Sequence, residues 1–186
     1  MKPSYSLTQS AILLLEQGDI TTYRGGALVN AANEQMLGGG GVDGAIHAAA
    51  GAELKSYCYD VPEVRPGVRC PTGEARITKA GSLQVDYVVH TVGPVYRNAG
   101  DSSSYLNSAY TQSLGLANRH GIKHIAFPAV SCGVYGYPYR DAAEIAVEAC
   151  LEHVGAINAI TFYLFSEPVY AAWQTVCDSL LKKTQN

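Results

Sequence analysis

Residues 28–51 read LVNAANEQMLGGGGVDGAIHAAAG, and the most specific signals of the chain lie in this stretch. An apolar run over residues 27–29 leads to two asparagines, Asn30 and Asn33, which we expect in a polar turn. Four glycines follow at 38–41, and then an alanine-rich segment with high helix propensity. The order strand, glycine loop and helix start is typical of an anion site. Glycines let a ligand approach the backbone, and the first N–H groups of a helix have no partner within it.

Composition and charge narrow the class of protein. The chain has 186 residues, of which 16% are charged and 47% hydrophobic. These values predict one compact domain over residues 1–186 and argue against disorder. The net charge is −3, so we expect neither nucleic acid nor a membrane as a partner. A bound anion would have to be held by local backbone dipoles.

Cysteine usage and the N-terminal residues bear on the compartment. The five cysteines are odd in number and form no CxxC pair, which argues against a disulfide framework and a zinc site. Residues 1–10 carry no apolar signal core, and no apolar run reaches membrane length. We therefore expect a soluble protein in the cytoplasm.

Hydrophobic periodicity predicts alternating strands and helices. The expected strands cover residues 11–15, 27–31, 73–80, 85–92, 122–130 and 159–165. The expected helices cover residues 42–57, 105–120, 140–154 and 169–182, with irregular segments at 58–72 and 98–104. Because strands and helices alternate in the second half, we expect a mostly parallel sheet with helices on both faces.

The glycine loop has a competing interpretation. Gly39, Gly41 and Gly44 match the letters of the dinucleotide fingerprint GxGxxG. However, residues 33–37 separate the strand from the first glycine, whereas a dinucleotide-binding turn is tighter. The region where that fold needs an acidic residue after its second strand is the proline-rich segment 58–72. Hydride transfer is therefore disfavoured.

The loop at residues 131–138, SCGVYGYP, follows a predicted strand and also has two interpretations. A nucleophile elbow would require a helix to begin at Ser131, but Gly133, Gly136 and Pro138 delay it. A second backbone nest, able to wrap phosphate oxygens with successive N–H groups, fits better. Cys132 has no histidine near in sequence to activate it, so a small residue in a tight loop is the preferred interpretation.

Two aspartates follow predicted strands or loops. Asp19 either caps a short helix begun by Thr21 or contacts a ligand, and the residues alone leave both open. Asp43 directly follows the glycine loop, where the helix dipole is expected to keep it ionised. It is the best-placed carboxylate for chemistry on a ligand of that loop, whereas His47, one turn later, is more often a packing residue.

Several motifs together resemble the macrodomain family, and most closely its MacroD-type branch of bacterial mono-ADP-ribosylhydrolases and O-acetyl-ADP-ribose deacetylases. These motifs are GDIT at 18–21, VNAAN at 29–33, GGGGVDGAIH at 38–47, PTG at 71–73, HTVGP at 90–94 and SCGVYGYP at 131–138. The resemblance implies a three-layer α/β/α sandwich with a central mixed, mostly parallel sheet. It implies binding of ADP-ribose without a metal or other cofactor. The expected partners are ADP-ribose, O-acetyl-ADP-ribose and mono-ADP-ribosylated proteins.

The resemblance also implies roles for individual residues. Asp19 would accept from the adenine amino group, Ile20 would flank the ring and Phe165 would stack on it. Asn33 would hold the proximal ribose, and Asp43 would orient or activate the attacking water. The diphosphate would lie between two backbone segments, Gly40, Gly41 and Val42 on one side and Ser131, Cys132, Gly133, Val134, Tyr135 and Gly136 on the other.

Two classes of function follow from the resemblance. One is an enzyme that removes mono-ADP-ribose from acidic side chains of proteins and deacetylates O-acetyl-ADP-ribose. The other is a non-catalytic module that reads ADP-ribose. Asp43 and Asn33 favour the enzyme, because a reader needs no carboxylate facing the proximal ribose.

Overall fold

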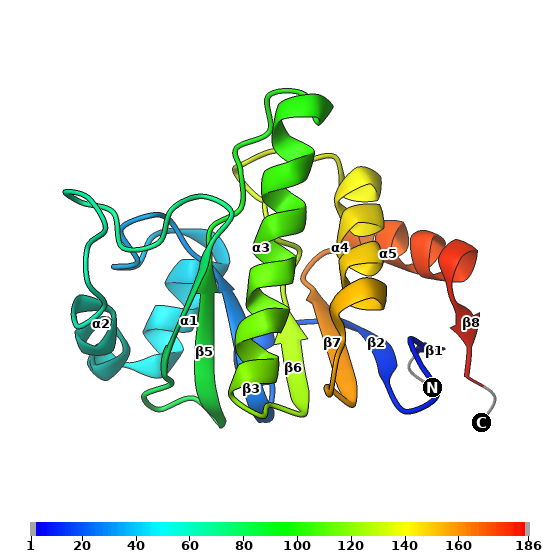
Figure 1. Cartoon of the computed structure of the whole chain (residues 1–186), viewed down its shortest axis with the longest axis horizontal. Coiled ribbons are helices and arrows are strands. Elements are labelled where there is room, and N and C mark those ends of the chain that lie inside the picture. The colour runs from blue at the N-terminus through cyan, green and yellow to red at the C-terminus, as the bar shows by residue number, and fades with distance from the viewer. Residues whose placement is uncertain (1–2, 185–186) are drawn as a thin grey trace.

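An eight-stranded mixed sheet lies at the centre of the molecule (Figure 1). The computed structural model describes residues 3–184. Across the sheet the strands are β4 (Ala75–Lys79), β5 (Val85–Thr91), β3 (Gly25–Ala31), β6 (His124–Phe127), β7 (Ala159–Leu164), β2 (Ile12–Gln17), β1 (Ser4–Ser6) and β8 (Lys182–Lys183). The central strands from β5 to β2 run parallel, and the edge strands pair antiparallel. The expected mixed, mostly parallel sheet is confirmed.

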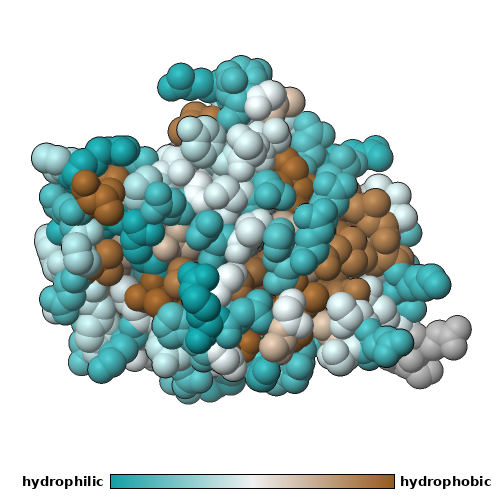
Figure 2. All heavy atoms as spheres, viewed as in Figure 1, coloured by the Kyte–Doolittle hydropathy of each residue, from teal (hydrophilic) through white to brown (hydrophobic). Residues whose placement is uncertain are grey.

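Helices cover both faces of this sheet. Two of them, α1 (Gly41–Ala50) and α2 (Ala52–Tyr59), pack on one face, close to the short 3-10 helix η1 (Ile20–Thr22). The other face carries α3 (Ala99–Arg119), α4 (Tyr139–His153) and α5 (Glu167–Leu180). Figure 2 shows mainly hydrophilic residues over α3, with hydrophobic residues gathered toward α4 and α5. The layers therefore form the expected α/β/α sandwich.

Each face of the sheet has its own hydrophobic core. Phe127 and Trp173 belong to the core beneath α3, α4 and α5, and both are fully buried. Leu28 and Ile46 belong to the core beneath α1 and α2. Because side chains alternate along a strand, Asn30 shares the face of Leu28 and points toward α1. This places a polar side chain in the apolar layer directly below the start of α1.

Some element boundaries differ from expectation. The helix expected over residues 42–57 is two helices, because Gly51 adopts φ +76° and its N–H closes α1 on the carbonyl of His47. The polar segment 98–104 is the first part of α3, and the side chain of Asn98 caps this helix by accepting from the N–H of Asp101. The edge strand β1 lies outside the expected elements. The helix expected over residues 169–182 ends at Leu180, and Lys182, its expected last residue, belongs instead to the edge strand β8.

The topology creates a crevice at one edge of the sheet. From β3 the chain continues into α1 on one face, whereas from β6 it continues into α4 on the opposite face. These two strands are neighbours, so the carboxyl ends of β3 and β6 flank a topological switch point, where ligands of open α/β sheets bind. Within residues 3–184, no helix is both long and apolar enough to span a membrane.

Candidate ligand-binding and active site

A continuous cleft lies at this switch point, and we name its two parts by their chemistry. The apolar end has a volume of about 430 Å³ and is lined by Gly18, Asp19, Ile20, Gly41, Val42, Ala45, Pro128, Ala129, Cys132, Gly133, Tyr139, Tyr163, Phe165, Ser166 and Val169. The acid end has about 360 Å³ and is lined by Ala31, Ala32, Asn33, Gly39, Gly40, Gly41, Val42, Asp43, Gly93, Ala129, Val130, Ser131, Gly133, Val134 and Tyr135. Four residues line both ends, which makes the cleft continuous: Gly41, Val42, Ala129 and Gly133.

The glycine loop forms one wall of the cleft and delivers the start of α1 to it. Gly40 occupies the N-cap position in an extended conformation, and no side chain caps the helix. Gly41 follows with φ +58°, a conformation that costs a residue with a side chain about 1–2 kcal/mol. The first N–H groups of α1 are thus free of intrahelical partners and lie at the junction of the two ends. This wall is suited to an anion.

The loop after β6 forms the opposite wall. Two local hydrogen bonds shape it, from the N–H of Gly136 to the carbonyl of Gly133 and from the N–H of Tyr137 to the carbonyl of Ser131. Ser131 itself has φ +65°, a strained conformation that non-glycine residues seldom adopt. Within the described chain, the N–H groups of Gly133 and Tyr135 donate to no protein acceptor. They are available to a ligand, as expected for a backbone nest.

The elbow alternative does not fit the geometry of this loop. The helix that follows, α4, begins at Tyr139 and not at Ser131. Burial raises the pKa of the Cys132 thiol to about 12, so this side chain is a neutral thiol at ordinary pH. Neither side chain is an activated nucleophile.

Asp43 lies in the first turn of α1 and is only 4% exposed. Its Oδ1 accepts a hydrogen bond from Nδ2 of Asn30 at 2.7 Å, and Nε2 of His47 lies 3.5 Å from the same oxygen. Burial raises the pKa of Asp43, and the Asn30 hydrogen bond and His47 oppose that rise. Loss of solvation is therefore the largest of these effects on the pKa, and the expectation that the helix dipole keeps Asp43 ionised stays a prediction. A carboxylate with a raised pKa is a better proton acceptor.

Asn33 lies beside Asp43 and also shapes the glycine loop. Its Nδ2 donates to the carbonyl of Gly38 at 3.2 Å, and its Oδ1 accepts from the N–H of Met36 at 3.1 Å. A Cβ built on Gly39 would lie 3.0 Å from Oδ2 of Asp43 and 3.3 Å from Nδ2 of Asn33. The two side chains therefore converge on one small space at the acid end, which only a glycine leaves open.

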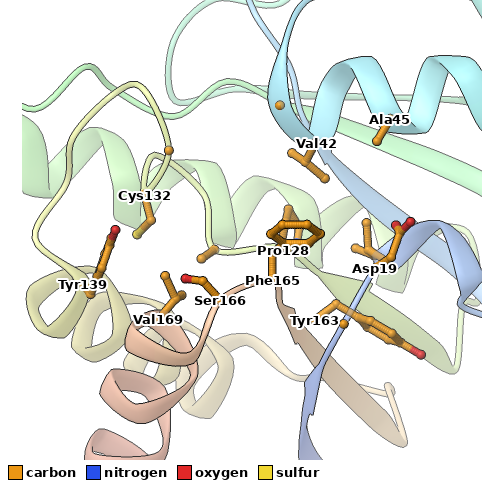
Figure 3. Close-up of a pocket in the computed structure, with 15 residues that line it drawn as sticks. Asp19, Val42, Ala45, Pro128, Cys132, Tyr139, Tyr163, Phe165, Ser166 and Val169 are labelled. Carbon is orange, nitrogen blue, oxygen red and sulfur yellow. The ribbon is translucent and has the colours of Figure 1, made fainter.

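The apolar end brings together residues that follow β2 and β6, the end of β7, and the starts of α1, α4 and α5 (Figure 3). Phe165 is 83% exposed, and Figure 3 shows it between Asp19 on one side and Tyr139 on the other. Oδ1 of Asp19 accepts from the N–H of Thr21 at 2.9 Å and from its hydroxyl at 2.8 Å. Asp19 is thus the cap of η1 and also lines the cleft, so the two alternatives left open by the sequence are compatible.

All but one of the predicted site residues line the cleft. The exception is Gly136, which adopts φ +69° and closes the turn behind it. Sequence reasoning missed Pro128 and Ser166, whose signal is their position just after a parallel strand, and Tyr139, which begins α4. It also misplaced Asn30, which is fully buried within β3 and holds Asp43 from below.

One group of side chains within residues 3–184 has the spacing of metal ligands. The ligand atoms of His47, Cys58 and His90 lie within 4.8 Å of one another. However, Nε2 of His90 lies 2.9 Å from Oγ1 of Thr78, and its Nδ1 lies 3.2 Å from Nδ2 of Asn30. Both ring nitrogens of His90 are engaged in hydrogen bonds, so we assign no metal to this group.

The layers and the cleft define a class, that of three-layer α/β/α proteins that bind an anionic ligand at a topological switch point. The family model described as "Macro domain" matches residues 29–146. A macro domain-containing protein of Vibrio parahaemolyticus is 54% identical over 160 residues, 86% of this chain and 94% of the relative. One from Xanthomonas axonopodis pv. citri is 49% identical over 162 residues, 85% and 90% of the two chains. The chain belongs to the macro domain family.

Solved structures agree with this assignment. The Oceanobacillus iheyensis macrodomain with ADP matches with a TM-score of 0.90 and 36% identity, over 97% of this chain and 96% of that one. The Trypanosoma brucei macrodomain in complex with ADP-ribose matches with a TM-score of 0.76 and 40% identity, over 88% of this chain and 68% of that one.

Proposed function

We propose that this macrodomain, taken as one domain over residues 1–186, is a MacroD-type hydrolase. It would bind ADP-ribose and remove mono-ADP-ribose from acidic side chains of proteins, and it would deacetylate O-acetyl-ADP-ribose. The observation that carries the proposal is the buried carboxylate of Asp43, which lies beside Asn33 at the end of an anion-binding cleft. A protein that only reads ADP-ribose gains nothing from burying a carboxylate there, because removing a charged group from water is costly.

In this proposal the ligand lies along the cleft with adenine at the apolar end. Asp19 accepts from the adenine amino group, Ile20 flanks the ring, and Phe165 stacks on it. The diphosphate lies between two backbone walls. One is formed by Gly40, Gly41 and Val42. The other is formed by Ser131, Cys132, Gly133, Val134, Tyr135 and Gly136, the last of which closes the turn. Supporting this, solved relatives are described with ADP and with ADP-ribose. Backbone walls also suit a protein with a net charge of −3.

In this proposal the reaction takes place at the acid end. Asn33 holds the proximal ribose, and Asp43 orients a water and accepts its proton as the water oxygen bonds to the anomeric carbon. The bond from that carbon to the protein's carboxyl oxygen breaks, which releases ADP-ribose and the free side chain. Because burial raises the pKa of Asp43, turnover should fall as the pH drops through this raised value and Asp43 becomes protonated.

A protein substrate has room beyond the acid end. A wider cavity of about 910 Å³ is lined by Glu34, Thr72, Pro94 and residues at the start of α3. Glu34 and Pro94 directly follow Asn33 and Gly93, which line the acid end. The polypeptide that carries the modified side chain can therefore approach from this side without displacing the nucleotide.

Release of ADP-ribose from a protein mono-ADP-ribosylated on aspartate or glutamate tests the proposal. Turnover by the wild-type protein is expected, together with tighter binding of ADP-ribose than of AMP in calorimetry. Binding of ADP-ribose without release would make the protein a reader. Equal affinity for the two ligands would contradict the two-walled diphosphate site.

A further inference from the structure

A row of buried polar side chains crosses the sheet beneath Asp43. It starts at Thr78 on β4, continues through His90 on β5 and Asn30 on β3, and ends at Asp43 on α1. The successive distances are 2.9 Å from Thr78 Oγ1 to His90 Nε2, 3.2 Å from His90 Nδ1 to Asn30 Nδ2, and 2.7 Å from Asn30 Nδ2 to Asp43 Oδ1. The four exposed fractions are 8%, 0%, 0% and 4%. Asn30 and His90 are also direct partners in the pairing of β3 with β5.

The hydrogen bonds in this row have one consistent direction. The hydroxyl of Thr78 lies 2.9 Å from the carbonyl of Lys79, to which it donates its only hydrogen. The NH₂ group of Asn30 can only donate, and it lies against both the carboxylate of Asp43 and Nδ1 of His90, so Nδ1 is an acceptor and His90 carries its proton on Nε2. Nε2 then donates to the hydroxyl of Thr78, and it also lies 3.7 Å from Sγ of Cys58. The second hydrogen of the Asn30 NH₂ group goes to Asp43.

The carbonyl oxygen of Asn30 shows what fixes this orientation. Within residues 3–184, Oδ1 of Asn30 is buried and has no hydrogen-bond partner. A buried polar atom without a partner is costly, so the two hydrogen bonds that the NH₂ group donates must outweigh this cost and set the orientation of the amide. The reverse orientation would place Oδ1 against the carboxylate of Asp43, and the two oxygens would repel each other.

We infer that His90 and Thr78 are positioning residues for the proposed hydrolysis: they fix the tautomer of the ring, the ring fixes the amide of Asn30, and the amide holds Asp43 toward the water. The inference rests on the proposed function. Burial lowers the pKa of His90 to about 3, so the ring is neutral near neutral pH and its hydrogen bonds select the tautomer.

Substitution of Thr78 tests this role, with Thr91 as the matched control. Thr91 is also a buried threonine of the sheet, but its hydroxyl bonds the carbonyls of Glu74 and Ala109 and makes no contact with the row. Thr78→Val frees the ring to take the other tautomer. We expect kcat to fall about tenfold, because a positioned proton-transfer group contributes about 10²–10⁴-fold and the variant loses only part of the positioning. KM and the affinity for ADP-ribose should stay within about twofold of the wild-type values. Thr78→Ser should retain wild-type kcat, and Thr91→Val should leave it unchanged.

The pH profile separates positioning from a general loss of structure. The titratable groups that face Asp43 are His47 on α1, Cys58 on α2 and His90 on β5. The Asn30 hydrogen bond lowers the pKa of Asp43, so weakening it should move the acid limb of kcat to higher pH in Thr78→Val only. If the wild-type protein is active, and Thr78→Val and Thr91→Val have the same kcat and the same acid limb in the pH profile, the inference is overturned.

The tautomer can be measured without turnover. Long-range ¹H–¹⁵N correlation spectra, with His90→Gln to assign the ring, should show the Nε2–H form without titration between about pH 5 and 9. A ring protonated on Nδ1, or one that titrates in this range, would overturn the inference even if the enzyme is active. Absence of turnover in the wild-type protein would instead overturn the proposed function and, with it, the role in catalysis, whatever the spectra show.

Discussion

At the acid end of the cleft Asp43 is 4% exposed and its carboxylate is held by a buried amide, whereas at the apolar end Phe165 is 83% exposed. The acid end depends on hydrogen bonds that cross β3, β5 and β4. The apolar end is lined by loop residues and the starts of helices, and within residues 3–184 Asp19 forms hydrogen bonds only in the turn that follows it. This difference agrees with the proposed function, because a reacting group must be held to a fraction of an ångström, whereas stacking of a base tolerates motion.

Gly41→Val should have the largest effect on binding, since Gly41 lies where the two ends join. A Cβ at this position would meet no protein atom within 4 Å, so the added side chain would fill the space expected for the diphosphate. Affinity for ADP-ribose should fall by more than about 100-fold, or roughly 2.8 kcal/mol. Gly121→Val is the control, because Gly121 also has a positive φ and open space but lies outside the cleft. Equal binding by the two variants in calorimetry would refute the diphosphate position.

Asn33→Ala should reduce kcat by about 100-fold, the size of loss that a small misplacement of a reacting group causes. The variant loses the amide that we propose to face the ribose, together with its donation to the carbonyl of Gly38 and the acceptor for the N–H of Met36. Asn33→Asp restores that acceptor, so it separates the two effects. Recovery of full kcat in Asn33→Asp would show that Asn33 only shapes the loop.

Asp19→Ala should cost about 1–3 kcal/mol of ADP-ribose affinity, the range for a hydrogen bond that involves a charged group. It also removes the cap of η1, which thermal unfolding would register. Asp19→Asn retains an oxygen that can cap the turn. We therefore expect Asp19→Asn to weaken binding without lowering Tm. An unchanged dissociation constant in both variants would leave Asp19 as a cap only.

Phe165→Ala should have the smallest effect, a loss of about 1 kcal/mol of affinity, the low end for stacking of a base on an aromatic ring. Because the ring is 83% exposed, Tm should not change. Kinetic assays at saturating substrate should give wild-type kcat, since the ring lies at the end of the cleft away from Asp43. A fall in kcat instead of affinity would contradict the division between the two ends.

Local sequence signals predicted the walls of the cleft but not the support beneath them. Four adjacent glycines before an alanine-rich segment predicted the start of α1 to within one residue, because both signals act over a few positions. Asn30 and His90 are 60 residues apart, and they meet only because β3 and β5 pair in register. No local pattern gives that pairing. The same limit applies to Gly51, because helix propensity is high on both sides of it and only its positive φ separates α1 from α2.

The most direct test of the account compares the wild-type protein with Asp43→Asn, which keeps the shape of the side chain but cannot accept a proton. ADP-ribose release from a protein mono-ADP-ribosylated on acidic residues should fall by about 10²–10⁴-fold, the usual contribution of a positioned proton-transfer group. Affinity for ADP-ribose, measured on the same preparations, should stay within about threefold, or roughly 0.7 kcal/mol. Near-wild-type release by Asp43→Asn would contradict the role of Asp43 as the base, and no release by the wild-type protein would contradict hydrolysis altogether.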